Sequence, residues 1–386
     1  MAKKPLNIAL IGYQFMGKAH SNAYRQVGRF FNLDVDPVMK VICGLVLEEA
    51  RDAAEKFGWQ EYSDNWEEVV NRPDIDLVDI ATPNSTHYPI ALAAAKAGKH
   101  ILCEKPLAMT VAQAKEMEMA AEQAGVINAV SYCYRRVPAV TFAKQLIDEG
   151  KIGKIHHFRG TYLQDWIVDP AFPLVWRLQK EVAGSGAHGD LNAHLIDAAR
   201  YLVGEIVEVS GHMETFVKKR PLLAASDDRL GGVASDQMGD VTVDDAAVFI
   251  ARFDNGALGT FEASRFCPGR KNYNRFEING SKGSIAINIE RLDEIEVYFH
   301  DDPPNVRGFR TINVTDGCHP YVGAYWPAAH IIGYEHTFIN QAKDLIECIA
   351  AGKKFSPDFS DGRKNQAVLE AVEKSSDTRA WVVPDL

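Results

Sequence analysis

Several features are scarce or missing in this 386-residue sequence, and each absence argues against a class of protein. No apolar run approaches the roughly 18 residues of a membrane-spanning helix, and the apolar stretch after the basic start is too short for a signal peptide. No lysine- and arginine-rich run stands out against a formal net charge of −10, so we expect no nucleic-acid or membrane partner. The six cysteines are scattered without zinc-site spacing, which predicts no metal site and no disulfide framework, and favours the cytoplasm.

The first third of the chain shows a regular alternation. Short apolar runs such as NIALIG and IDLVDIAT are separated by helical patterns such as EEARDAAEKFG. Strands alternating with helices of this length indicate βαβ units and a parallel sheet with helices on both faces. The length suggests about two domains, and we place the first over residues 1–135.

The pattern changes after about residue 136. A helix and a strand lead into an irregular, tryptophan-rich segment, and from about residue 206 strand-like runs follow one another, separated by turn signals such as Asp254-Asn255-Gly256. Sequential strands with hairpin turns predict a largely antiparallel sheet, so we expect a second α/β domain over residues 136–386. Residues 220–239, which contain several serines, aspartates and glycines, are expected to form a loop.

A glycine turn follows the first expected strand, in the stretch GYQFMG. Gly12 and Gly17 occupy the first and last glycine positions of a dinucleotide-binding turn, where a tight bend and close helix packing require them. Gln14 stands where a middle glycine would let phosphate approach most closely, and its amide is able to donate a hydrogen bond. The free amides of the following helix suit a pyrophosphate. This motif alone supports a structural turn and a cofactor site about equally.

Polar motifs follow two later strands of the expected parallel sheet. Thr82-Pro83-Asn84 ends one strand and Glu104-Lys105-Pro106 ends the next, at the sheet edge where doubly wound folds bind ligands. Further along, Asp190 and His194 are four residues apart, on one face of an expected helix. With Lys105 they would bring together a base, a cation and a carboxylate.

These motifs together resemble the Gfo/Idh/MocA family of nicotinamide-dependent sugar and cyclitol oxidoreductases, over nearly the whole chain. The most specific stretches are GKHILCEKPLAMT and GSGAHGDLNAHLIDAARYLVG, and YLQDWIVDPAFPLVWR is similar to the subgroup of levoglucosan dehydrogenase and glycoside 3-dehydrogenases. The resemblance implies a Rossmann domain, a second domain with a large, open, mostly antiparallel sheet, and substrate bound between them against the nicotinamide. It also implies a homodimer or homotetramer.

The resemblance assigns the chemistry to three residues. Lys105 is the lysine of the EKP motif and would hold the substrate oxygen, while Asp190 and His194 are the paired acid and base. His194 suits the hydroxyl proton because an unperturbed histidine has a pKa of about 6.5. The choice between His194 and Lys105 as the formal base stays open. Asn192, where many members have glycine, and Gln14 depart from the family pattern.

Further contacts are expected in two groups. The cofactor positions are Gly12, Gln14, Phe15, Met16, Gly17, Gly44, Thr82, Asn84, His87, Glu104 and Lys105. The substrate positions are Tyr134, Arg135, Gln164, Trp166, Trp176, Arg177, His319 and His336, with Tyr325 and Trp326 as further aromatic candidates. Aromatic rings cover the apolar faces of sugars, although core packing explains the aromatic residues equally well.

Cofactor choice depends on the end of the second expected strand. Gly44 and Leu45 stand where an acidic residue would bind the ribose 2′-hydroxyl of NAD, or an arginine the 2′-phosphate of NADP. Because a missing arginine forfeits a charge-assisted contact, we favour NAD, with NADP as the alternative.

Three functions fit these motifs. The first is an NAD(P)-dependent dehydrogenase that takes hydride from a ring hydroxyl of a sugar, anhydrosugar, glycoside or cyclitol. The second is a redox-neutral, NAD-dependent glycosidase of the same family, and the third is a non-enzymatic dinucleotide or sugar sensor. Retention of Lys105, Asp190 and His194 argues against the sensor, because a sensor needs no proton relay.

Overall fold

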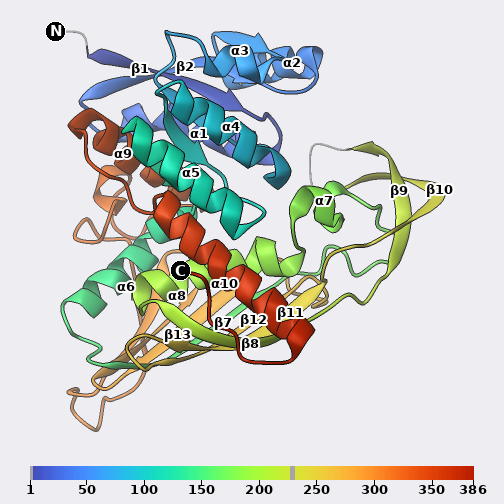
Figure 1. The fold of residues 1–386 in the computed structure, drawn as a ribbon. Helices are drawn as coiled ribbons and strands as arrows, with labels where there is room; N and C mark the ends of the chain where they lie inside the picture. The colour runs from blue at the N-terminus through green and yellow to red at the C-terminus, as the bar shows by residue number, and fades with distance from the viewer. Residues whose placement is uncertain (1–2, 227–230) are drawn as a thin grey trace.

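The computed structural model describes residues 3–226 and 231–386, which form two adjoining sheet-based domains (Figure 1). The first contains a six-stranded sheet in the order β3-β2-β1-β4-β5-β6, with every neighbouring pair parallel. Its strands are β1 (Lys4–Ile11), β2 (Val35–Cys43), β3 (Glu61–Ser63), β4 (Leu77–Ile80), β5 (His100–Cys103) and β6 (Asn128–Val130). Its helices are α1 (Phe15–Phe30), α2 (Leu47–Phe57), α3 (Trp66–Val70), α4 (His87–Lys96) and α5 (Val111–Ala124). The predicted Rossmann sheet is confirmed.

The strand order reverses beside β1, which has β2 on one side and β4 on the other. The strands here are continuous apolar runs, and all four residues of β4 are buried, as expected for a parallel sheet covered on both faces. A crevice at the carboxyl ends of the strands, next to such a reversal, is the ligand site of doubly wound folds. A ligand site is therefore expected among the residues that follow β1, β4 and β5.

The second domain contains an eight-stranded sheet in the order β16-β15-β14-β13-β7-β12-β11-β8. Only β7 and β12 pair in parallel, so the prediction of a large, mostly antiparallel sheet is confirmed. The strands are β7 (Ile155–Leu163), β8 (Ile206–Glu214), β11 (Ala246–Phe253), β12 (Leu258–Ser264), β13 (Tyr273–Gly280), β14 (Gly283–Asn288), β15 (Glu294–Phe299) and β16 (Arg310–Asn313).

Helices connect this sheet to the first domain. α6 (Pro138–Asp148), α8 (Ala193–Leu202) and α10 (Phe359–Thr378) pack against its strands (Figure 1). α9 (Tyr334–Ala351) packs against α1, and α10 also contacts α5, so the end of the chain returns to the first domain. In the part of the chain that the structure describes, no helix combines the length and the apolar character needed to cross a membrane.

The expectation of a loop over residues 220–239 was wrong for residues 220–226 and 232–239. β9 (Lys219–Ser226) and β10 (Gly232–Asp240) pair as an antiparallel hairpin beside the sheet, with residues 227–230 outside the described part (Figure 1). Arg220, which belongs to β9, is fully buried, and its guanidinium donates to the carbonyls of Ile167 and Asp169 at 2.5 and 2.8 Å. Contacts distant in sequence thus stabilise strands that the polar composition concealed.

Candidate active site

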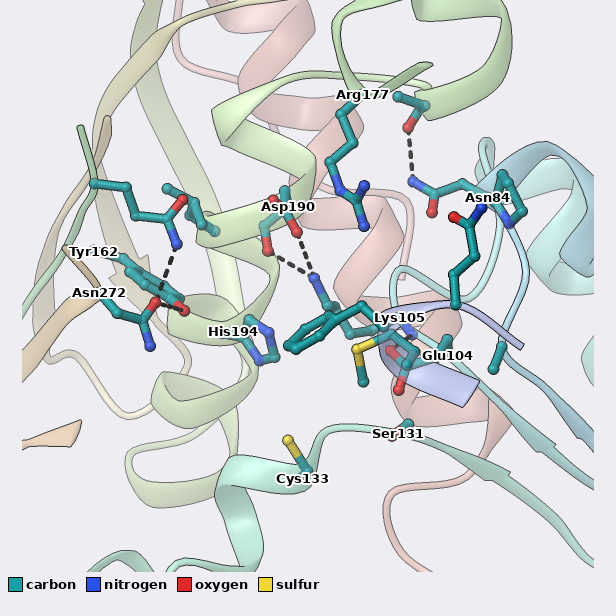
Figure 2. Close-up of a pocket in the computed structure, with 18 of the residues that line it drawn as sticks. Asn84, Glu104, Lys105, Ser131, Cys133, Tyr162, Arg177, Asp190, His194 and Asn272 are labelled. Atoms are coloured by element: carbon teal, nitrogen blue, oxygen red, sulfur yellow. Dashed lines mark hydrogen bonds and ion pairs between the residues drawn. The ribbon is translucent and has the colours of Figure 1, made fainter. Parts of the chain in front are cut away.

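A cavity of about 460 Å³ lies between the domains, at the carboxyl ends of β1, β4 and β5 (Figure 2). Several predicted residues line it together: Gln14, Phe15, Met16, Thr82, Asn84, Glu104, Lys105, Tyr134, Gln164, Trp166, Trp176, Arg177, Asp190 and His194. Residues from both expected domains, 1–135 and 136–386, contribute to its lining.

Lys105 and Asp190 form an ion pair at the centre of this cavity (Figure 2). Lys105 Nζ lies 2.6 Å from Asp190 Oδ1, and Arg265 Nη2 lies 2.7 Å from the other carboxylate oxygen. Burial alone would raise the pKa of Asp190, but the positive charges of Lys105, Arg265 and Arg177 hold it well below its usual range. Asp190 is therefore ionised and held by cations from two sides.

A short π-helical turn, His188–Asn192, carries Asp190 into the cavity and precedes α8. Asp244 anchors its start, accepting hydrogen bonds from the amides of Gly186 and His188 at 2.7 Å each. Gly186 is needed there because a Cβ atom would lie 1.8 Å from the Asp244 carbonyl oxygen. Gly186 thus permits the close approach to Asp244 that positions Asp190.

His194 faces the same cavity from the first turn of α8. Its ring centroid lies 4.7 Å from that of Tyr134 and 6.0 Å from that of Tyr162. Desolvation and the nearby charge of Lys105 lower its pKa from 6.5 to about 3, so the imidazole is neutral. The unperturbed pKa of about 6.5, which favoured histidine as the base, thus does not apply to this buried side chain.

A buried network that the sequence did not reveal holds the EKP segment from behind. His20 Nε2 lies 3.0 Å from Glu104 Oε1, and its Nδ1 lies 2.8 Å from Asp79 Oδ2. Tyr24 donates to the same Asp79 oxygen at 2.7 Å. Burial would lower the pKa of His20, yet the two carboxylates raise it to about 10. A charged imidazolium thus fixes Glu104, which in turn accepts the Lys105 amide at 3.1 Å.

The glycine turn has the geometry of a dinucleotide cradle. Gly12 has a φ of 109°, and a Cβ atom there would lie 2.4 Å from the Ala81 carbonyl oxygen. At Gly17 a Cβ atom would lie 2.1 Å from the Gly12 carbonyl oxygen. Gln14, directly before α1, has no side-chain capping bond, so its amide group is available to a ligand. The first amides of α1 and this cradle fit a pyrophosphate.

Two residues predicted to bind the cofactor, His87 and Gly44, do not line the cavity and lie behind its wall. His87 is fully buried and bridges the carbonyls of Thr82 and Pro106 at 2.9 Å each, which joins the loops after β4 and β5. Gly44 lies under the ring of Tyr13 and does not line the cavity. Asn84 does line it, and its side-chain amide donates to the Ala183 carbonyl at 2.8 Å.

Three of the predicted substrate residues lie outside the cavity. Arg135 is 4% exposed and binds Asp197 at 2.6 Å, because the 3₁₀ turn after β6 directs it into the protein. His319 accepts the Asp316 amide at 3.2 Å and packs against Phe142. His336 accepts the Gly333 amide at the start of α9. Of the further aromatic candidates, Tyr325 and Trp326 pack against Phe30 instead.

The cavity also contains residues that were not predicted from the sequence, among them Tyr162, Arg265, Asn272 and Tyr334. Tyr162 donates to Asn272 Oδ1 at 2.7 Å, and Gln164 Nε2 donates to the same oxygen at 3.0 Å. The Trp166 indole donates to Gln164 at 2.8 Å. These side chains come from β7 and the segment after it, from the ends of β12 and β13 and, for Tyr334, from the start of α9. Only the folded chain brings these elements together, so no local pattern marks them.

No group of three or more histidine, cysteine, aspartate or glutamate side chains is arranged to hold a metal ion among residues 3–226 and 231–386. Lys105 and Arg265 are instead both paired with the Asp190 carboxylate. Arg177 stacks on Trp176, with 4.3 Å between its guanidinium and the ring centroid. It points toward the space between Asn84 and Asp190 (Figure 2).

Replacing Gln14 with glycine tests whether this side chain disturbs the cradle. We expect Gln14→Gly to bind NADH within about tenfold of the original affinity, because the Gly12 and Gly17 contacts that form the turn are unchanged. Fluorescence titration with NADH measures this directly. Absence of dinucleotide binding both before and after the substitution would contradict a functional cradle.

Comparison with known proteins gives matches along both domains. Residues 6–132 match the model "Oxidoreductase family, NAD-binding Rossmann fold", and residues 140–286 match "GFO/IDH/MocA C-terminal domain". A levoglucosan dehydrogenase of Pseudarthrobacter phenanthrenivorans is 47% identical over 99% of both chains. A Bacillus subtilis scyllo-inositol 2-dehydrogenase (NAD(+)) is 34% identical over 68% of this chain and 70% of its own. A levoglucosan dehydrogenase solved with NADH and levoglucosan superposes with a TM-score of 0.94, at 46% identity, over 99% of this chain and 100% of its own.

Proposed function

The chain belongs to the Gfo/Idh/MocA family of oxidoreductases, and we propose that it is an NAD-dependent dehydrogenase that oxidises a ring hydroxyl of a sugar, anhydrosugar, glycoside or cyclitol. The observation that carries this proposal is the cavity in which Lys105, Asp190 and His194 meet beside the glycine cradle. It unites a dinucleotide site with a cation, a carboxylate and a neutral base.

Each of the three residues has a defined task. Lys105, held by Asp190 at 2.6 Å, donates a hydrogen bond to the substrate oxygen and stabilises negative charge that develops there. His194 is neutral and accepts the hydroxyl proton. A weak base suffices, because the O–H becomes strongly acidic while hydride leaves the same carbon. NAD, when bound, supplies the hydride acceptor.

The remaining proposed contacts divide between the two ligands. Gly12, Gln14, Phe15, Met16, Gly17, Thr82, Asn84 and Glu104 surround the dinucleotide, with His87 supporting the loops behind them. Tyr134, Gln164, Trp166, Trp176 and Arg177 contact the sugar, together with Tyr162 and Asn272. The linked row of Tyr162, Asn272, Gln164 and Trp166 offers hydroxyl, amide and indole groups to several sugar hydroxyls. The 47% identity to a levoglucosan dehydrogenase supports an anhydrosugar within this class.

The second sheet also supports a homodimer or homotetramer. Val248, Ile250 and Leu258 on β11 and β12 are 46–52% exposed, on the face of the sheet that the packed helices leave uncovered. A second copy of this chain would bury them. All six cysteines are unpaired, which supports the reducing cytoplasm as the location.

An absorbance assay at 340 nm tests the proposed reaction. NAD is mixed separately with levoglucosan, inositols, free sugars and aryl glucosides. We expect NADH to accumulate with one of these classes, in proportion to the amount of substrate added. Release of aglycone with a substoichiometric amount of NAD, and without net formation of NADH, would indicate the redox-neutral glycosidase instead. Dinucleotide binding without turnover of any of these compounds would contradict the dehydrogenase.

A further inference from the structure

The end of β2 lacks the acidic residue that many NAD-binding folds place there, and an aromatic ring lies over this position. The ring of Tyr13 lies directly on the Gly44 backbone, where a Cβ atom would be only 1.8 Å from Tyr13 Cε1. Any larger residue at position 44 would displace this ring. The absence of a side chain at Gly44 therefore leaves room at the strand end for the ring of Tyr13, which belongs to the glycine turn.

The hydroxyl of Tyr13 reaches a carboxylate on the next helix. It donates to Glu49 Oε2 at 2.7 Å, and the Val46 backbone binds the same hydroxyl. Burial and the Glu49 charge raise the pKa of Tyr13 to about 12, so it remains a hydrogen-bond donor. Because Glu49 lies in the first turn of α2, directly after β2, its carboxylate is held near the carboxyl end of that strand.

The position of this pair in the sheet corresponds to one end of the dinucleotide. β2 lies on the opposite side of β1 from β4 and β5, whose carboxyl ends lead to Asn84 and Lys105. In doubly wound dinucleotide folds the adenosine ribose lies at the end of the second strand, and an acidic group there binds its 2′-hydroxyl. Tyr13 directly follows Gly12, so the pair adjoins the pyrophosphate cradle at the adenosine side.

We propose that Glu49, oriented by the Tyr13 hydroxyl, binds the adenosine ribose 2′-hydroxyl and excludes a 2′-phosphate, so that this pair sets the preference for NAD over NADP. The inference rests on the dinucleotide use proposed above. A carboxylate accepts the two ribose hydroxyls but repels a phosphate dianion. The first cation of α2, Arg51, is paired with Asp52 at 3.1 Å and does not neutralise Glu49.

Binding titrations of NADH and NADPH test the pair without requiring turnover. We expect the unmodified protein to bind NADH more tightly. Glu49→Gln should weaken NADH binding by about threefold to tenfold and strengthen NADPH binding by about tenfold, because it removes both the charged acceptor and the repulsion. Tyr13→Phe should shift the NADH-to-NADPH affinity ratio in the same direction by a smaller factor, since Glu49 loses its anchor.

Glu48→Gln is the matched control, because it removes a neighbouring charge from the same turn of α2. Its affinity ratio should stay within about twofold of the original, since a solvent-exposed charge without the ribose contact contributes little. Equal affinity of the unmodified protein for both dinucleotides, or an unchanged ratio in Glu49→Gln, would overturn the inference while leaving the dehydrogenase intact. Failure of the unmodified protein to bind either dinucleotide would overturn both.

Discussion

Lys105→Met is expected to lower kcat by about 10²–10⁴-fold while leaving NADH affinity within a few-fold. The substitution removes the cation 2.6 Å from Asp190 that we assign to the substrate oxygen. The fold should survive, because Asp190 keeps its ion pair with Arg265 at 2.7 Å. Steady-state rates at saturating NAD, together with NADH titration of the same preparation, separate the loss of chemistry from a loss of binding.

His194→Ala should show a loss of the same order, whereas Lys271→Met serves as a matched control. Lys271 also lines the cavity, but its ammonium is paired with Asp165 at 2.8 Å and its side chain is 78% exposed. We expect this control to change kcat by less than about tenfold, because an exposed ion pair contributes little. Near-normal turnover in both Lys105→Met and His194→Ala would show that the chemistry has been assigned to the wrong residues.

The lowered pKa of His194 also predicts the form of the pH profile. Because that pKa is about 3, the imidazole of the free enzyme stays neutral throughout the physiological range and gains no proton between pH 8 and about 5. We therefore expect kcat/KM to show no fall on the acid side from His194 in that range. An acid limb with a pKa near 6.5 that disappears in a slow but measurable His194 variant would contradict this description of the site.

The second large effect is expected in stability, at His20. His20→Ala should lower the free energy of unfolding by about 3–5 kcal/mol, because it leaves the buried carboxylates of Asp79 and Glu104 without their shared cation. His20→Gln, which retains polar contacts and removes the charge, should be intermediate. Urea unfolding measures both variants, and His300→Gln is a control at an exposed histidine after β15. A loss below about 1 kcal/mol in His20→Ala would indicate that water or Lys105 already compensates the carboxylates.

The pH dependence of this stabilisation has a defined sign. Since folding raises the pKa of His20 from 6.5 to about 10, its contribution is complete below pH 6.5 and is lost as the pH rises through about 10. The stability difference between the original protein and His20→Gln should therefore shrink across that window. A difference that stays constant would mean that His20 is neutral in the folded protein and acts through hydrogen bonds alone.

Much of the candidate site followed from short stretches of sequence. Gly12 and Gly17 mark the cradle, and Lys105, Asp190 and His194 stand in motifs whose spacing reflects local geometry: a strand end, a tight turn and one face of a helix. The parallel first sheet and the mostly antiparallel second sheet could be predicted for the same reason, because strand and helix periods and hairpin turns are local properties. The individual roles of these residues remain predictions until the variants are measured.

Other features required the assembled chain. Arg135 lies in the 3₁₀ turn after β6, and its partner Asp197, 62 residues further along the chain, holds its side chain away from the cavity. Arg265 and Asn272 join the site only because β12 and β13 both pair with β7. The hairpin of β9 and β10 depends on carbonyls near residue 170 that receive the buried Arg220.

The sequence by itself determined the family, the two sheet types, the dinucleotide turn and the three residues at the centre of the cavity, because each depends on residue type and short-range spacing. The tertiary structure alone decided the direction in which the pKa values of Asp190 and His194 shift, and the identity of their neighbours. The pKa values of His194 and His20 move in opposite directions, since one is buried beside a cation and the other between two carboxylates. The burial of a side chain and its distances to charged groups depend on the folded arrangement of the whole chain, so no short stretch of sequence determines them.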